Sequence, residues 1–164
     1  MSDPTIVVMG VSGCGKTTVG RSLAEARGAV FIDADDLHPP ENLTRMAAGV
    51  PLDDEARAPW LDAVAAAIAA RTQAGESVVV ACSALRRRYR ERLREVGPVR
   101  FVLLDAPEGL LRDRLADRVD HFMPVSLLAD QLATLERPGP DEPDALIVDG
   151  TLPLDELVRH LTEP

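Results

Sequence analysis

Lysine is almost missing from this chain of 164 residues, because every one of its 18 Lys and Arg side chains except Lys16 is an arginine. Aromatic residues are scarce as well, at 3% of the chain, so a core must be built mainly from aliphatic side chains. No apolar run approaches the roughly 20 residues that a helix needs to cross a bilayer. These absences argue against a membrane-spanning protein, and they make the position of the one lysine informative.

Cysteine is also rare, and Cys14 and Cys82 are too few to build a disulfide framework. Neither lies in a Cys-x-x-Cys sequence or beside a cluster of histidines, which argues against a metal or catalytic role for them. Two unpaired thiols are typical of a reducing compartment. The chain also reaches its first apolar stretch at Thr5, which leaves no room for a signal peptide. We therefore expect a cytoplasmic protein.

The charge balance is acidic, with a formal net charge of −9 at pH 7. An acidic chain repels a phosphate backbone over long distances, whereas nucleic-acid-binding proteins normally carry a basic face. The composition therefore argues against a nucleic-acid partner and favours a small-molecule substrate. Two signatures of other classes are missing. With Lys16 as the only lysine there is no Asn-Lys-x-Asp sequence that reads guanine, and Val78–Ser83 lacks the Asp-Glu pair typical of motor ATPases.

Apolar stretches rich in β-forming residues alternate with segments of helical periodicity. The stretches are Thr5–Met9, Ala29–Asp33, Ser77–Cys82, Val99–Asp105 and Ala145–Asp149. Repeated β-α alternation predicts an α/β fold of three layers, in which helices cover both faces of a parallel sheet. At this length, with no internal repeat or long linker, we expect one domain over residues 1–164. Ligands of such sheets bind at the carboxyl ends of the strands.

The octet Gly10–Thr17 matches the phosphate-loop pattern G-x-x-x-x-G-K-[ST] and contains the single lysine. In such a loop, backbone N–H groups surround a phosphate, the lysine reaches the β- and γ-phosphates, and the hydroxyl residue binds Mg²⁺. The simpler alternative is a glycine-rich turn, but a predicted strand precedes the octet and a predicted helix follows it. The sequence therefore predicts a site for ATP and Mg²⁺. Its expected nucleotide-binding residues are Gly10, Val11, Ser12, Gly13, Cys14, Gly15, Lys16, Thr17 and Thr18.

Acidic residues follow the second predicted strand, where Asp33 and Asp35 point the same way along an extended strand end. One carboxylate can support Mg²⁺ together with Thr17, and the other can accept a hydrogen bond from an attacking hydroxyl and orient it. We assign Asp33 to the metal and Asp35 to the hydroxyl. The alternative is that these aspartates cap the next helix, a role for which Asp36 is well placed.

Arginines crowd the segment after the third predicted strand, at Arg86, Arg87, Arg88, Arg90, Arg92 and Arg94. The amino-terminal turn of this predicted helix faces the carboxyl edge of the sheet, which favours Arg86 and then Arg90 for substrate binding. Arg92 and Arg94 lie further along and are expected on a solvated surface, the commonest place for a run of charges.

Another pair of arginines, Arg114 and Arg118, lies on one helical face at the start of a lid-like segment of about residues 114–136. Positive charge there would close over a transferring phosphoryl group, neutralise its charge and exclude water. The alternative is that both form surface ion pairs with Asp113 and Asp117.

Several blocks together resemble the gluconate kinase (gluconokinase) family and follow the family's order over nearly the whole chain. They are Met9–Thr18, Asp33–Pro39, Arg45–Gly49, Pro51–Asp54, Pro59–Leu61, Cys82–Leu85 with Tyr89-Arg90, His121–Met123, Gln131 and Thr134–Glu136. The phosphate loop alone indicates only a broad superfamily of kinases, whereas the aspartate, Cys-Ser-Ala-Leu and His-Phe-Met blocks are far more selective. The chain departs from the family at Ala34, commonly glycine, and at Val119-Asp120, commonly Lys-Gly.

The resemblance implies ATP-dependent phosphorylation of the 6-hydroxyl of D-gluconate. It also implies a homodimer with the five-stranded, lidded fold of nucleoside monophosphate kinases and shikimate kinase. Lys16, Asp35, Arg114 and Arg118 would be catalytic. Which of the arginines meets the substrate carboxylate stays open among Arg57, Arg86 and Arg90. The full substrate-binding set would be Asp35, His38, Arg57, Ser83, Arg86, Arg90 and His121. For His38 the alternative that it only caps its turn stays open, and His121 is expected to shape the lid rather than to transfer protons.

Two other functions fit the phosphate loop less well. A kinase for another small acid, such as shikimate, is disfavoured because Cys82–Leu85 stands where a glycine triplet is expected. A regulatory module that binds ATP without turning it over is disfavoured by the intact pair of Asp33 and Asp35 and by the arginines of the lid-like segment.

Overall fold

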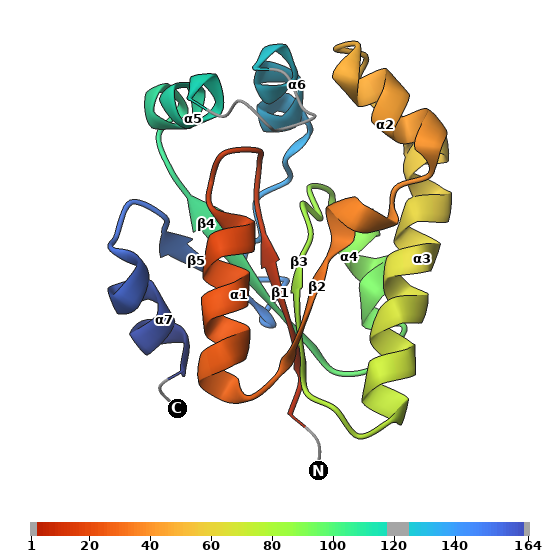
Figure 1. Ribbon diagram of the computed structural model, residues 1–164, viewed down its shortest axis with the longest axis vertical. Coiled ribbons are helices and arrows are strands. Elements are labelled where there is room, and N and C mark those ends of the chain that lie inside the picture. Colours follow the sequence, from red (N-terminus) through yellow and green to blue (C-terminus); the bar gives the residue numbers. More distant parts are fainter. Residues whose placement is uncertain (1–2, 118–124, 163–164) are drawn as a thin grey trace.

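The computed structural model describes residues 3–117 and 125–162, and its centre is a parallel sheet of five strands (Figure 1). The strands are β1 (Thr5–Met9), β2 (Val30–Asp33), β3 (Val78–Ala81), β4 (Val99–Asp105) and β5 (Ala145–Asp149). They lie in the order β2-β3-β1-β4-β5, so β1 occupies the middle of the sheet. The predicted α/β fold is confirmed, and the predicted stretches match the strands to within a residue at each end.

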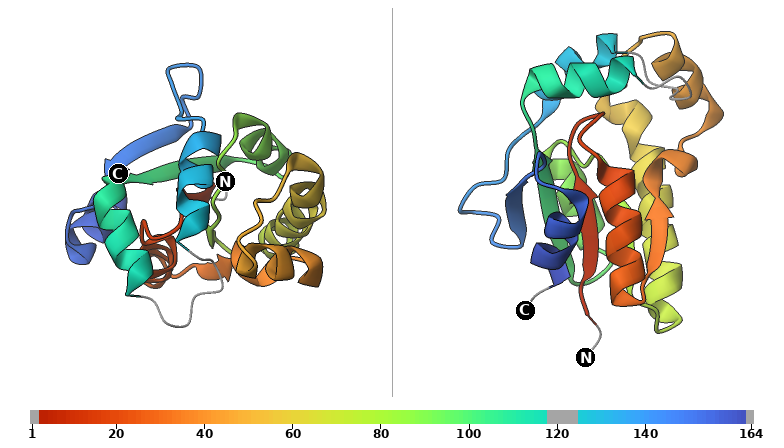
Figure 2. Two further views of the ribbon diagram at one scale, coloured as in Figure 1. Left: turned by 90° about the horizontal axis from the view of Figure 1, so that it is seen from above. Right: turned by 60° about the vertical axis from the view of Figure 1, so that its left-hand side comes forward.

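Helices cover both faces of this sheet (Figures 1 and 2). On one face α1 (Lys16–Arg27) packs beside α7 (Leu154–Thr162), and on the other α3 (Asp54–Gln73) packs beside α4 (Arg87–Arg94). The elements beyond the carboxyl ends of the strands are the 3-10 helix η1 (Ala34–Leu37), α2 (Pro40–Ala47), α5 (Glu108–Ala116) and α6 (Ser126–Thr134). None of the helices in the described part of the chain is long and apolar enough to cross a membrane.

The core consists mainly of aliphatic side chains, as the scarcity of aromatic residues predicts. Every residue of β1 is buried, because strands flank it on both sides and helices cover both faces. The carboxylate of Asp53 accepts a hydrogen bond from the Ala56 backbone N–H at 2.8 Å and caps the amino end of α3. One face of α3 is at most 5% exposed, with the helical spacing seen in the sequence, and it consists of Trp60, Leu61, Val64, Ala65 and Ile68.

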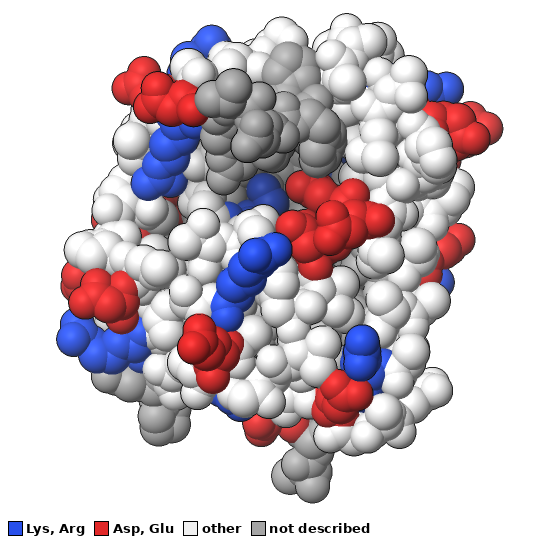
Figure 3. Space-filling model, in the orientation of Figure 1, with Lys and Arg blue, Asp and Glu red and all other residues white. Residues whose placement is uncertain are grey.

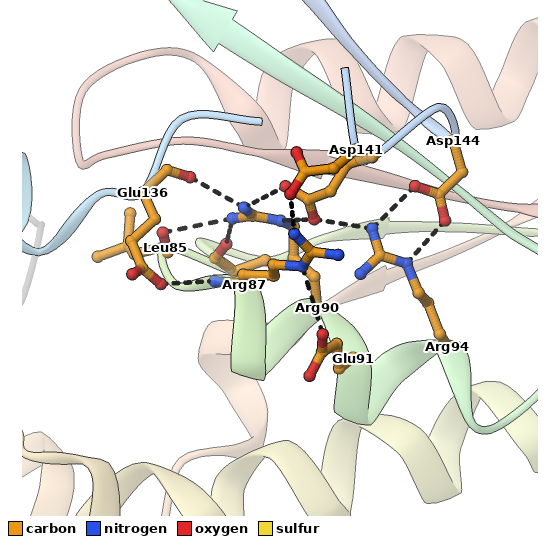
Figure 4. A network of polar contacts seen from close by, with 10 residues as sticks. Leu85, Arg87, Arg90, Glu91, Arg94, Glu136, Asp141 and Asp144 are labelled. Carbon is orange, nitrogen blue, oxygen red and sulfur yellow. Dashed lines mark hydrogen bonds and ion pairs between the residues drawn. The ribbon is translucent and has the colours of Figure 1, made fainter. Parts of the chain in front are cut away.

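A network of buried polar contacts joins α4 to the segment between α6 and β5 (Figure 4). Arg90 on α4 is fully buried, and its Nε and Nη2 donate to the two carboxylate oxygens of Glu142 at 2.8 and 2.7 Å. Its Nη1 and Nη2 also donate to the backbone carbonyls of Ala84, Leu85 and Glu136. A buried guanidinium is tolerated when its donors are satisfied in this way, so Arg90 serves to hold these segments together.

The position of Arg94 differs from the predicted solvated surface. Its side chain is 24% exposed, its guanidinium donates to Asp144 and Glu142, and its Cζ lies 4.9 Å from the centre of the Phe101 ring. The acidic partners come from positions 48 and 50 residues further along the chain. The charge pattern of α4 alone therefore could not reveal them.

The carboxylate of Glu142 makes the stability of this network depend on pH. Hydrogen bonds, first from Arg90 and then from Arg94, lower the pKa of Glu142 from 4.5 to about 2. A carboxyl group with a lowered pKa stabilises the fold above its unfolded-state pKa, and this contribution is lost as the pH falls toward the folded-state value. We expect Glu142→Gln to lower the free energy of unfolding by about 3 kcal/mol near neutral pH, because Arg90 and Arg94 lose their shared anion.

Urea unfolding at a series of pH values measures this effect. The difference between wild type and Glu142→Gln should shrink as the pH falls from 4.5 to about 2. The matched control is Asp141→Asn, which removes a carboxylate that is 64% exposed and pairs with Arg87. We expect it to change stability by less than about 1 kcal/mol. A difference for Glu142→Gln that stays constant across this pH range would contradict the assignment.

Candidate active site

A cleft opens at the carboxyl ends of β1, β2 and β3, where the fold predicts a ligand site. It encloses about 600 Å³ of empty space, open solvent at its mouth included. Figure 3 shows a hollow in the upper half of one face, with basic atoms inside it and acidic atoms at its rim. The cleft is lined by Ser12, Gly13, Gly15, Lys16, Thr17, Asp35, His38, Met46, Leu52, Arg57, Trp60, Ser83, Leu85 and Gln131.

The loop between β1 and α1 has the backbone conformation that an anion site requires. Gly10 and Gly13 have φ angles of 140° and 86°, in the region that favours glycine. A Cβ at Gly10 would lie 2.8 Å from Cys14 Sγ, and one at Gly13 would lie 3.1 Å from the Leu111 carbonyl. The loop ends at the amino terminus of α1, whose first turn carries no acidic residue. Its N–H groups and the positive end of the helix dipole therefore suit a phosphate.

The two reactive side chains at the start of α1 already have partners. The ammonium group of Lys16 donates to the Val11 carbonyl at 3.1 Å. The hydroxyl of Thr17 donates to Asp33 Oδ2 at 3.3 Å, while Asp33 Oδ1 accepts from the Asp35 backbone N–H at 3.0 Å. Asp33 thus combines two predicted roles, because it caps η1 and also lies beside the predicted metal ligand Thr17. Two neighbouring oxygen donors are the chemistry that Mg²⁺ prefers, so these residues fit the metal.

Asp35 and Asp36, the other two aspartates of this segment, lie in different surroundings. Asp35 lines the cleft together with Lys16 and Thr17, as predicted. The extended strand end predicted for this segment is wrong, because the chain turns into η1 directly after Asp33 and Asp35 belongs to that short helix. Asp36 is exposed, and Asp33 rather than Asp36 caps the short helix η1. The structure therefore brings one carboxylate into the cleft and places a second beside Thr17.

His38 lies on the wall of the cleft and is held as a neutral imidazole. Its ring stacks on Trp60, with centroids 4.3 Å apart and planes at 10°. Its Nδ1 accepts a hydrogen bond from Asn42 Nδ2 at 3.3 Å, and the same amide donates to the Ala56 carbonyl at 3.0 Å. Burial, and then the charge of Arg57, lower the pKa of His38 from 6.5 to about 4. The proton of the neutral ring is therefore on Nε2, which makes that atom a donor.

Among the residues that the structure describes, Arg57 is the one arginine that lines this cleft. It is 8% exposed, and its Nη1 donates to the Tyr89 hydroxyl at 2.9 Å. That hydroxyl in turn donates to the carboxylate of Asp54. The guanidinium also lies over the Tyr89 ring, 5.4 Å from its centre. This chain of contacts fixes the orientation of a cation that faces an anion-binding cleft.

The structure does not bring the other two candidate arginines into the cleft. Arg90 belongs to the buried network described above. Arg86 lines a neighbouring hollow that Arg57 also borders. Within residues 3–117 and 125–162, Arg86 Nε is the one buried side-chain nitrogen or oxygen without a hydrogen-bond partner. Ser83, in contrast, lines the cleft as predicted.

A second, open hollow is lined by residues of the loop, α1, α5 and the start of α7, with about 860 Å³ of empty space when the open solvent is included. Gly13 and Gly15 line both hollows, so the two adjoin at the loop. Arg114 borders the second hollow, and its Nη1 donates to the Gly13 carbonyl at 3.1 Å. The predicted roles of Arg118 and His121 lie outside the described residues.

Sequence reasoning gave no role to Gln131, although it belongs to the resembling blocks. Gln131 on α6 is 7% exposed, and its Oε1 accepts a hydrogen bond from the Ser12 backbone N–H at 2.7 Å. The two residues are 119 positions apart, so no local pattern could have paired them. Asn42 and Tyr89, which hold His38 and Arg57, were missed for the same reason.

Comparisons with known proteins find relatives over nearly the whole chain. A family model described as an AAA domain matches residues 6–138. A gluconokinase of Gluconobacter oxydans (strain 621H) is 50% identical over 94% of this chain and 89% of its own length. The crystal structure of a gluconokinase from Sinorhizobium meliloti 1021 is 51% identical, has a TM-score of 0.83, and is matched over 95% of this chain and 87% of that one.

A more distant structure shares only the fold. Shikimate kinase from Aquifex aeolicus is 16% identical, with a TM-score of 0.63 over 96% of this chain and 93% of that one. This likeness confirms the shikimate kinase type of fold that the resemblance implied.

The lowered pKa of His38 gives a pH dependence separate from that of Glu142. Between pH 6.5 and about 4 the unfolded chain takes up a proton at this residue while the folded chain does not, so stability falls as the pH is lowered through this window. We expect NMR titration of the ring to report a pKa near 4, and His38→Gln to lose less stability than wild type over the same window. A His38 pKa at or above 6.5 would contradict the buried, neutral assignment.

Proposed function

The chain belongs to the gluconokinase family, and we propose that it transfers the γ-phosphoryl group of ATP to the 6-hydroxyl of D-gluconate, giving 6-phospho-D-gluconate and ADP. One observation carries the proposal: a single cleft combines a phosphate loop with a carboxylate, Asp35, and a held cation, Arg57. Phosphoryl transfer needs these parts, because its catalysis rests on positioning and on the stabilisation of charge.

On the nucleotide side, the loop N–H groups and Lys16 bind the β- and γ-phosphates. Lys16 now donates to a carbonyl of its own loop, at Val11, so a bound phosphate would take over that ammonium group. The adenosine part occupies the hollow bordered by Thr18, Arg114 and Gly150. This assignment is supported by the contact of that hollow with the loop glycines.

We assign Mg²⁺ to the hydroxyl of Thr17 and, through water, to the carboxylate of Asp33. The support is their adjacency and the anchoring of Asp33 by the Asp35 backbone N–H. When bound, Mg²⁺ supplies positive charge that neutralises the phosphates during transfer.

On the acceptor side, Asp35 accepts a hydrogen bond from the 6-hydroxyl and aims it at the γ-phosphate. Of the three candidate arginines, Arg57 is assigned to the carboxylate of gluconate, because it lines the cleft and its orientation is fixed by Tyr89. His38 donates from Nε2 to a substrate hydroxyl, and Ser83 offers a further polar contact in the same cleft.

Other family expectations continue as proposals. Arg114 stabilises the transferring group from its place beside the Gly13 carbonyl, and Arg118 and His121 keep the roles that the family resemblance implies. We also expect the protein to be cytoplasmic and to form a homodimer. Light scattering of the purified protein tests the homodimer.

The functional test is ADP release from Mg·ATP, measured by a coupled assay with a panel of acceptors. The panel contains D-gluconate, other sugar acids, shikimate, nucleoside monophosphates and D-glucitol, which has a chain of hydroxyls but no carboxylate. We expect turnover with D-gluconate and little with D-glucitol, since the cleft presents a cation for the carboxylate. Activity with another acceptor and none with D-gluconate would overturn the substrate and leave the kinase. Bound ATP without turnover of any acceptor would point to a regulatory module.

Asp35 gives the sharpest test of mechanism. We expect Asp35→Asn to lower kcat by at least about 100-fold, because the amide no longer accepts the hydroxyl proton as a carboxylate does. Steady-state kinetics with D-gluconate measures the change, and circular dichroism checks that the variant is folded.

The neighbouring Asp36 offers a matched control, since Asp36→Asn makes the same chemical change one residue away on an exposed side chain. Its kcat should stay within about twofold of wild type. Near-normal turnover by Asp35→Asn would refute the role given to that carboxylate without touching the identity of the substrate.

A further inference from the structure

Helix α6 (Ser126–Thr134) contacts the phosphate loop through one side chain to which no role has yet been given. Gln131 and Ser12 both line the cleft and are 7% and 6% exposed. The Ser12 backbone N–H donates to Gln131 Oε1 at 2.7 Å, a short distance for an amide donor. A contact this buried and this well formed restricts the loop, because breaking it leaves a buried donor without its acceptor.

The position of Ser12 within the loop gives this contact its importance. On one side, the Val11 carbonyl accepts from Lys16 Nζ at 3.1 Å. On the other side, the Gly13 carbonyl accepts from Arg114 Nη1 at 3.1 Å. Gln131 therefore holds the middle one of three successive loop residues, each fixed by a different side chain. A loop that receives phosphate through its N–H groups must be preorganised in this way, since its glycines supply no rigidity.

Helix α6 can transmit this restraint because its far end is itself anchored. Just past the helix, the Glu136 backbone N–H donates to the Leu85 carbonyl at 2.7 Å, and Glu136 Oε1 accepts from the Arg87 backbone N–H at 2.9 Å. The Glu136 carbonyl accepts from Arg90 Nη2, as Figure 4 shows. The side chain of Gln131 is thus carried by a helix tied to the rigid segment between β3 and α4.

The other half of α6 contacts the acceptor side of the cleft. Leu127 packs with Met46 of α2 and with Leu52, which precedes α3, in a small apolar cluster separate from the main core. Met46 and Leu52 also line the cleft. In addition, a Cβ at Gly49 would lie 3.3 Å from Ser126 Oγ, so the chain between α2 and α3 passes close to the start of α6.

We propose that Gln131 is a positioning residue for phosphoryl transfer, which holds the Ser12 N–H and keeps the phosphate loop in the conformation that receives ATP. It acts through the loop backbone and makes its contribution on the nucleotide side of the reaction. This inference rests on the proposed kinase activity for its kinetic test, but nucleotide binding tests it independently.

The decisive variant is Gln131→Met, which preserves the length and approximate volume of the side chain and removes the acceptor. We expect kcat/KM for ATP to fall by about 10- to 100-fold, the range that follows from leaving one buried donor unpaired. The KM for D-gluconate should change by less than about twofold, because the acceptor wall is intact. The Kd for ADP, measured by calorimetry without any acceptor, should rise by about 10-fold. Gln131→Asn, one methylene too short to reach Ser12, should behave like Gln131→Met.

A control separates positioning from a general loss of stability. Ile68→Val removes one methyl group from a fully buried position on α3 that does not line the cleft. It should lower the melting temperature while its kcat, both KM values and its Kd for ADP stay within about twofold of wild type. The Gln131 variants should differ from it in the ATP and ADP constants even where their melting temperatures are similar.

The measurements on the Gln131 variants either support or overturn the role proposed for this residue. If Gln131→Met and Gln131→Asn keep kcat/KM for ATP and the Kd for ADP within about twofold of wild type, the proposal is overturned. It is equally overturned if the KM for D-gluconate rises by as large a factor as kcat/KM for ATP falls, because Gln131 would then affect both sides of the cleft. A wild-type protein inactive with D-gluconate would remove the proposed function, and the ADP measurement would still decide the role of Gln131.

Discussion

The hydrogen bonds that the phosphate loop must offer to an anion constrain the rest of this structure. Backbone N–H groups can converge on a phosphate only if the chain turns sharply between a fixed strand and a fixed helix. The fixed strand is β1, which lies in the middle of the sheet and is buried at every residue. The turn requires Gly10 and Gly13, where φ is positive and where a Cβ would collide with Cys14 Sγ at Gly10 and crowd the Leu111 carbonyl at Gly13. The packing of α5 against the loop thus depends on the absence of a side chain at Gly13.

Charge is distributed so that an acidic protein presents cations to an anionic substrate. Outside the cleft, three arginines of α4 are held by carboxylates: Arg90 and Arg94 by Glu142, and Arg87 by Asp141. Lys16 and Arg57, by contrast, are held by a carbonyl and a phenol, which do not cancel their charge. The net charge of −9 is therefore compatible with binding ATP and an acid. The electrostatic potential in the cleft is set by nearby groups, because solvent screens the distant surface carboxylates at physiological salt.

Much of this arrangement follows from the sequence, and what does not follow has one physical cause. The five strands, the loop Gly10–Thr17 and the position of Asp35 just after the second strand were predictable because each depends on neighbours along the chain. The buried role of Arg90 was not predictable, since its partner Glu142 lies 52 residues away. A helical arginine run looks the same whether its partners are water or a carboxylate from a distant loop. The contact of Gln131 with Ser12 was hidden in the same way, because tertiary packing alone creates it.

Two anions have to share this cleft, and the site resolves their repulsion by separating the cations that hold them. Lys16 stands at the start of α1, where the proposed reaction has it bind the phosphates, whereas Arg57 stands on α3, where it would bind the acid. Arg57 also disfavours a charge on His38, whose low pKa keeps the ring neutral and leaves Nε2 as a donor for a neutral hydroxyl. Asp35, which lines the same cleft as these two cations, is the carboxylate that would meet the reacting hydroxyl in the proposed reaction. This division of charge among α1, α3 and η1 would therefore orient the acceptor as well as bind it, because the carboxylate end and the hydroxyl end of the substrate would each meet a group of complementary chemistry.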